Sequence, residues 1–138
     1  MCLVTYLLDT NAISDLVGEQ PRLTARIAAL PGADRVCTCS IVRGEILHGL
    51  MRLPAGKRRT SLGTKVTTIL EALACEPISP ATADAYAAVK LTRQQAGLPL
   101  DDNDCWIAAA AIQLGATLIS RDTDFQRIEG LRVEDWSI

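Results

Sequence analysis

Short apolar runs alternate with longer segments of helical pattern along almost all of this 138-residue sequence. The apolar runs that predict buried strands lie at 3–8, 35–38, 116–120 and 131–134, with 76–78 as a candidate edge strand. Between them, apolar residues recur at spacings of three and four, which indicates helices. Because parallel strands need helical crossovers, this alternation is typical of an α/β domain with a mostly parallel central sheet.

Ordinary start and stop signals bound the predicted helices. We expect helices at 12–17, 21–30, 41–53, 57–74, 80–96 and from 101 or 102 to 114. Ser40 and Ser79 are the expected caps of the third and fifth helices, and Gly97 and Gly115 close the last two. Asp9 and Asn11 are both candidate caps for the first helix.

Composition restricts the class of protein. The length fits one domain over residues 1–138, and with 49% hydrophobic residues it can bury a core without disulfides. A net charge of −2 argues against a generally basic nucleic-acid binder but permits a local basic patch. Five scattered cysteines form no disulfide or zinc pattern, so we expect reduced, small hydrophobic side chains. Because no signal peptide or membrane span is evident, we expect a cytoplasmic protein with no membrane partner.

Two aspartates follow predicted strands directly. Asp9 ends the first apolar run, and Asp122 comes just after the run at 116–120. In open parallel sheets, ligands gather at the carboxyl ends of the strands, so these two acids are candidate site residues. The structural alternatives are a helix cap for Asp9 and a tight turn for Asp122.

Two further acids lie near predicted helix starts. Glu45 lies off the main apolar face of its helix, where the alternative is a solvated charge favoured by the helix dipole. Asp104 belongs to the run Asp-Asp-Asn-Asp at 101–104, in which capping and the dipole explain two acids more easily than three. The alanine-rich helix that follows would pack close to the sheet and carry Asp104 inward beside Asp9.

Together the four acids predict one cluster of carboxylates at one edge of the sheet. Such a cluster attracts a hard divalent cation, which suggests phosphodiester chemistry. The hydroxyl and amide groups of Thr10, Asn11 and Ser120 lie beside the acids in the sequence and are expected to orient them. Asp124 lies close enough to Asp122 to assist or replace it.

Four segments of the sequence resemble the PIN-domain family and, within it, the VapC toxin ribonucleases of bacterial toxin–antitoxin pairs. The segments are LLDTN at 7–11, GEIL at 44–47, NDCWIAA at 103–109 and TLISRDTDF at 117–125. The resemblance runs in the right order along nearly the whole chain. It implies a three-layer α/β/α fold, an endoribonuclease that depends on Mg²⁺ or Mn²⁺, a homodimer and a VapB-type antitoxin partner.

The same resemblance implies roles for the acids. Asp9 and Asp104 would hold one ion most directly, while Glu45 and Asp122 would bind through water or help to place a second ion. Whether one or two ions act stays open. The alternative function is a catalytically silent PIN-like domain that only binds an antitoxin, which the presence of all four acids disfavours.

Two other classes lack required residues. A receiver domain needs an adjacent acid pair after the first strand and a central acceptor aspartate, and an Asp-x-Asp phosphatase needs an acid where Asn11 stands. A separate basic stretch at 52–65 contains no acid. Within it, Arg58 and Arg59 are candidate RNA-binding residues, with a solvated helix face as the alternative.

Overall fold

The computed structural model describes residues 3–138. Within this range, five strands form one sheet in the order β3-β2-β1-β4-β5, and every neighbouring pair is parallel. The strands are β1 (Thr5–Leu8), β2 (Arg35–Cys39), β3 (Ala74–Glu76), β4 (Thr117–Ile119) and β5 (Arg132–Glu134). The predicted α/β class with a parallel sheet is therefore confirmed.

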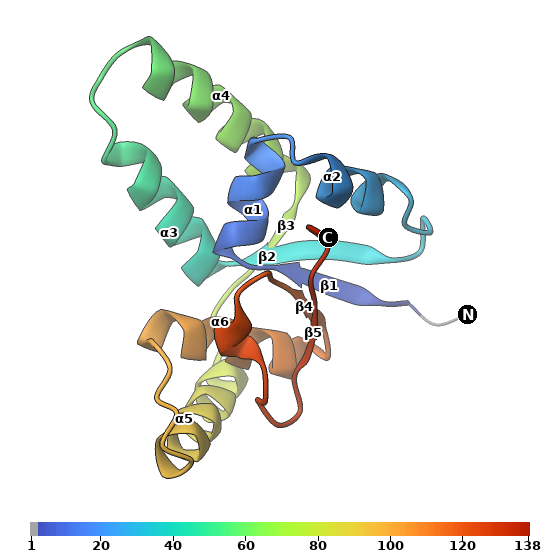
Figure 1. Cartoon of the computed structure of the whole chain (residues 1–138), viewed down its shortest axis with the longest axis vertical. Helices are drawn as coiled ribbons and strands as arrows, with labels where there is room; N and C mark the ends of the chain where they lie inside the picture. Colours follow the sequence, from blue (N-terminus) through green and yellow to red (C-terminus); the bar gives the residue numbers. More distant parts are fainter. Residues whose placement is uncertain (1–2) are drawn as a thin grey trace.

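Six α-helices of the described chain flank this sheet in a three-layer arrangement. They are α1 (Thr10–Val17), α2 (Pro21–Ala28), α3 (Ser40–Met51), α4 (Lys57–Ala72), α5 (Pro80–Gln95) and α6 (Asp102–Leu114), with a short 3₁₀ helix, η1 (Thr123–Phe125). Helices α1 to α4 lie on one side of the sheet, and α5 and α6 lie together on the other (Figure 1).

The predicted boundaries needed corrections around β3. The helix expected to reach residue 74 ends at Ala72, and the strand expected at 76–78 occupies Ala74–Glu76. Pro77 explains the shift, because a residue without a backbone N–H ends the ladder at Glu76. The expected position of this strand at the edge of the sheet is confirmed.

Ser40 does not cap α3 as the sequence predicted. Cys39 occupies the cap position without a side-chain cap hydrogen bond, and Ser40 is the first helical residue. The Ser40 hydroxyl instead donates to the Glu76 carbonyl at 3.4 Å, which ties the start of α3 to the end of β3. The Ser79 cap of α5 is confirmed, and its hydroxyl accepts from the Thr82 amide.

Helix α6 contributes a continuous run of buried residues to the core. Ile107 and the four alanines that follow it in α6 are at most 3% exposed. The small alanine side chains let the helix pack against β4, as the sequence suggested. No helix within residues 3–138 is long and apolar enough to span a membrane.

The cysteines mostly behave as small core residues. Cys37 and Cys39 are fully buried free thiols of β2, and burial raises the pKa of Cys37 to about 11, which makes this thiol inert. The prediction that the cysteines are core residues is wrong for Cys75 on the edge strand, because this residue is exposed. Cys2 lies outside the described residues.

Candidate functional site

The carboxyl ends of β1 and β4 place the first two site residues side by side. Leu8 pairs with Ile119 in the parallel ladder, so Asp9 and Ser120 are the next residues on neighbouring strands. The Asp9 amide continues the ladder by donating to the Ile119 carbonyl at 3.2 Å. Because the strands are parallel, both chains leave the sheet at the same edge.

Asp9 is a buried carboxylate that also caps α1. Its side chain is 3% exposed, and Oδ1 accepts the Ala12 amide at 2.7 Å. Of the two candidate caps of α1, Asp9 takes the position, because Asn11 already lies inside the first turn. Burial raises the pKa of Asp9, while hydrogen bonds from Ser120 and the Ala12 amide partly oppose the shift.

Glu45 is held by donors from two other helices. The Thr10 hydroxyl in α1 donates to Oε1 at 2.5 Å, and the Asn103 amide in α6 donates to Oε2 at 3.3 Å. Glu45 is therefore half-buried between α1, α3 and α6 and is not a solvated helix charge. Asn103 is a site residue that the sequence did not single out, although an amide directly before Asp104 was the available signal.

The three acids at the start of α6 have different surroundings. Asp101 caps the helix by accepting the Asn103 amide, and the exposed Asp102 pairs with Lys90 at 2.8 Å. Asp104 alone faces the other candidate acids. Burial first, and then the charges of Asp101, Asp122, Glu45 and Asp9, raise the pKa of Asp104 to about 6. Asp104 thus shares its electrostatic environment with all three other candidates.

Asp122 and Asp124 differ in their relation to this group. The Asp122 amide donates to Ser120 Oγ at 3.0 Å, and Asp122 Oδ1 accepts the Asp124 amide at 2.9 Å to begin η1. The charge of Asp122 raises the pKa of both Asp9 and Asp104, whereas Asp124 is exposed and is not among the main causes of either shift. Among the hydrogen bonds of residues 3–138, the side chains of Asn11 and Asp124 make none to the four acids.

None of the four acids is neutralised by a basic side chain of the described chain. The ion pairs among residues 3–138 use Asp15, Glu76, Asp102 and Glu134 instead. An open hollow of about 330 Å³, lined by Glu45, Asn103 and His48 among others, lies beside Glu45. Arg121 is near enough for its charge to lower the pKa of Asp9, but it forms its ion pair with Asp15. The candidate site therefore holds four acids without an ion pair in the described chain, and Glu45 is reached from the hollow.

Carboxylate oxygens are the donors that Mg²⁺ and Mn²⁺ prefer. Within the described residues, no three His, Cys, Asp or Glu side chains are grouped so that they could hold an ion by themselves. Mg²⁺ usually binds through one or two carboxylates and keeps several waters, so it does not require such a group. The donor set of the four acids therefore fits a hydrated divalent ion.

The structure does not bring Arg58 and Arg59 to the acids. They begin α4, beyond the end of α3 that lies away from the sheet (Figure 1). The 12 residues of α3 span about 18 Å at 1.5 Å per residue, which separates this end from the sheet edge. The basic residues of the stretch, Arg52, Lys57, Arg58, Arg59 and Lys65, form no ion pair within the described chain.

The chain is similar to known proteins over almost its whole length. The model of the PIN domain family matches residues 6–131. Ribonuclease VapC1 of Haemophilus influenzae (strain R2866) is 30% identical over 140 residues, covering 96% of this chain and 98% of the relative. Ribonuclease VapC2 of Rickettsia felis is 27% identical, covering 95% of this chain and 97% of the relative.

Solved structures show the same fold. The structure of VapBC2 from Rickettsia felis, bound to a DNA fragment from its promoter, superposes with a TM-score of 0.87 at 26% identity, covering 96% of this chain and 99% of that one. VapBC-1 from nontypeable Haemophilus influenzae gives a TM-score of 0.85 at 28% identity, covering 98% and 100%. The chain therefore belongs to the PIN-domain family and, within it, to the VapC toxin ribonucleases of VapBC toxin–antitoxin systems.

Proposed function

We propose that this chain is a single-domain, metal-dependent endoribonuclease that acts as the toxin of a type II toxin–antitoxin system. The observation that carries the proposal is the convergence of Asp9, Glu45, Asp104 and Asp122 at one sheet edge without a basic partner in the described chain. Relatives named as VapC ribonucleases support the same reaction class.

In this proposal, Asp9 and Asp104 hold Mg²⁺ or Mn²⁺ most directly, and Glu45 and Asp122 bind through water or help to hold a second ion. A bound divalent ion supplies a water of lowered pKa and neutralises negative charge on the phosphate. Asp122, and not Asp124, is the proposed fourth acid, because its charge acts on Asp9 and Asp104.

The neighbouring polar groups keep the acids in place before RNA binds. Thr10 and Asn103 together occupy both oxygens of Glu45, which fixes the plane of its carboxylate. Ser120 contacts both Asp9 and the backbone of Asp122, so one hydroxyl links two of the acids. Such fixed ligands lower the reorganisation needed when phosphate arrives.

The proposed protein partner is a VapB-type antitoxin, since similar structures are VapBC and FitAB toxin–antitoxin complexes. A groove of about 370 Å³ runs between α1, α3 and α4. Its walls are mostly apolar, and its lining includes Thr10 and Glu45. An apolar helix of the antitoxin would fit this groove, and a basic side chain beyond it would reach the acids and displace the metal. We also propose a homodimer, on the family resemblance alone.

The test uses purified protein freed of antitoxin and a mixed RNA substrate. We expect cleavage with Mg²⁺ or Mn²⁺, none in EDTA, and products without 2′,3′-cyclic phosphate, because water and not the 2′-hydroxyl attacks. Cyclic phosphate ends, or full cleavage in EDTA, would contradict the mechanism. A protein that binds its antitoxin tightly but cuts no RNA under any metal would establish the catalytically silent alternative.

A further inference from the structure

Arg93 in α5 is a charged side chain inside the protein. It is only 9% exposed, and no carboxylate of the described chain pairs with it. Burying an unpaired cation is costly, so the arginine must make contacts that offset the loss of water. These contacts lie on the segment that follows the proposed fourth acid.

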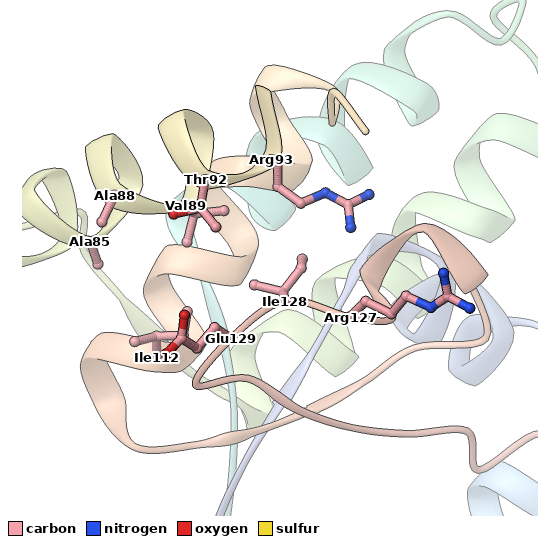
Figure 2. A pocket seen from close by; sticks show the side chains of 9 residues that line it. All are labelled: Ala85, Ala88, Val89, Thr92, Arg93, Ile112, Arg127, Ile128 and Glu129. Atoms are coloured by element: carbon pink, nitrogen blue, oxygen red, sulfur yellow. The ribbon is translucent and has the colours of Figure 1, made fainter. Parts of the chain in front are cut away.

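The guanidinium of Arg93 spans two backbone carbonyls of that segment. Nη1 donates to the Gln126 carbonyl at 3.2 Å, and Nη2 donates to the Asp124 carbonyl at 3.4 Å. Figure 2 shows the side chain extending from α5 toward the segment that carries Arg127 and Ile128. Nε is buried without a partner among the described residues, so both contacts come from the outer fork of the side chain.

The segment that Arg93 holds is continuous with the Asp122 turn. The Asp124 amide donates to Asp122 Oδ1, while the carbonyl of Asp124 accepts from Arg93. Further along, Arg127 has a φ of +64°, a left-handed conformation that a non-glycine residue keeps only where its surroundings hold it. The Arg93 contact to the preceding Gln126 carbonyl supplies such a restraint.

We propose that Arg93 is a positioning residue that fixes the direction of the Asp122 carboxylate by clamping the backbone of residues 124–126. The role of Asp122 rests on the proposed function, whereas the clamp rests on the two hydrogen bonds. The planar fork of arginine can reach two carbonyls at once, and the single ammonium of lysine cannot do so in the same geometry. Lysine at position 93 therefore keeps the charge and removes the clamp.

The variants should still fold. Phe125 and Ile128 are 2% and 7% exposed, so the core anchors the segment independently of Arg93. Arg132→Lys is a matched control, because Arg132 also donates to a backbone carbonyl, that of Gly115 at 3.4 Å. Gly115 precedes β4, at the opposite end of that strand from Asp122.

The experiment compares wild type, Arg93→Lys, Arg93→Met and Arg132→Lys in three measurements. The first measurement is amide hydrogen exchange over residues 121–130 without metal. The second is Mn²⁺ affinity by calorimetry, and the third is the rate of RNA cleavage as a function of Mn²⁺ and RNA concentration. Both Arg93 variants should exchange roughly tenfold faster at residues 123–127, because local opening becomes easier. They should bind Mn²⁺ about tenfold more weakly, which is typical when a group that orients a metal ligand is removed. KM for RNA should stay unchanged, and Arg132→Lys should match wild type.

The proposal is contradicted if the Arg93 variants lose thermal stability but match Arg132→Lys in amide exchange over residues 121–130 and in Mn²⁺ affinity. Arg93 would then stabilise the fold without positioning Asp122. The proposal is also contradicted if Arg93→Lys behaves as wild type, since charge and not the fork would then suffice. Failure of the proposed function would give a different result, in which wild type cuts no RNA. The amide exchange data would still show whether Arg93 holds the backbone of residues 124–126.

Discussion

The Thr10 hydroxyl donates a 2.5 Å hydrogen bond to Glu45 Oε1 and so joins the first turn of α1 to α3. Glu45 lies 35 residues further along the chain, and its other oxygen accepts from Asn103 in α6. The orientation of this acid is therefore a property of three packed helices. The candidate site therefore includes the uncharged side chains of Thr10 and Asn103 as well as the four acids.

Replacing Thr10 with valine tests this relationship. Valine keeps the branched shape but removes the donor, so we expect a folded protein that loses about 1 kcal/mol of stability. Cleavage should fall roughly tenfold because Glu45 is less well fixed. Thr10→Ser keeps the hydroxyl and is the control. Cleavage by Thr10→Val at the wild-type rate would show that the hydrogen bond has no catalytic consequence.

Asp9 combines a cap and a buried charge, and two substitutions separate them. Asparagine keeps an oxygen that can accept the Ala12 amide, whereas alanine does not. In EDTA, Asp9→Asn should melt at or above the wild-type temperature, because burial disfavours the charged form of Asp9. Asp9→Ala should lose about 1 kcal/mol with the cap.

Adding Mg²⁺ should then raise the melting temperature of wild type more than that of Asp9→Asn, since a ligand stabilises only the state that binds it. Thermal melts of the three proteins with EDTA and with Mg²⁺ supply the comparison. Strong destabilisation of Asp9→Asn in EDTA would show that the carboxylate charge itself is structural, against its assignment as a metal ligand.

The pKa of Asp104 predicts a pH dependence of metal-free stability. Burial and the neighbouring acids raise this pKa from its usual 3.8 to about 6. The folded state therefore holds a proton on Asp104 more tightly than the unfolded state does. The resulting stability is fully present below pH 3.8 and is lost as the pH rises through about 6.

Asp104→Asn should remove this step from a plot of unfolding free energy against pH in EDTA, measured by denaturant titration. Wild type should also bind Mn²⁺ more weakly at about pH 5 than at about pH 7.5, because the proton competes with the metal for Asp104. Identical pH profiles for the two proteins would mean that Asp104 does not titrate in this range.

The sequence predicted the fold well because each level of pattern agreed with the next. Strand and helix alternation indicated the parallel sheet, and the positions of Asp9 and Asp122 directly after strands indicated their common edge. The predictions were wrong where a side chain can form a hydrogen bond with more than one partner. Ser40 donates to the Glu76 carbonyl instead of capping its own helix, and a one-dimensional pattern does not show that partner.

The same limit applies to the site. Asp9 takes the cap of α1, a role that Asn11 was equally able to fill from its sequence position. Asn103 and Arg93 donate to residues that lie 58 and at least 31 positions away, so their partners cannot be read from the neighbouring sequence. Only the tertiary structure brings these donors to their acceptors.

The basic stretch at the start of α4 leads to a prediction about substrate affinity. Arg58 and Arg59 lie away from the acids, where they would contact RNA that extends beyond the cleavage site. Neutralising both to glutamine should weaken RNA binding and reduce the slope of log affinity against log salt by about 0.7 for each phosphate that is no longer neutralised. Arg22→Gln with Arg132→Gln is a control of equal charge. An unchanged slope would make the stretch a solvated helix face.

If the four clustered acids carry metal-dependent RNA cleavage, the cleavage rates of antitoxin-free wild type and Asp104→Asn should differ across a Mg²⁺ titration. Circular dichroism and melting curves first establish that both proteins are folded. We predict that the wild-type rate rises with Mg²⁺ and vanishes in EDTA, while Asp104→Asn is slower by roughly 100-fold or more, a loss of about 2.7 kcal/mol in transition-state stabilisation. Cleavage by Asp104→Asn at the wild-type rate would contradict the account.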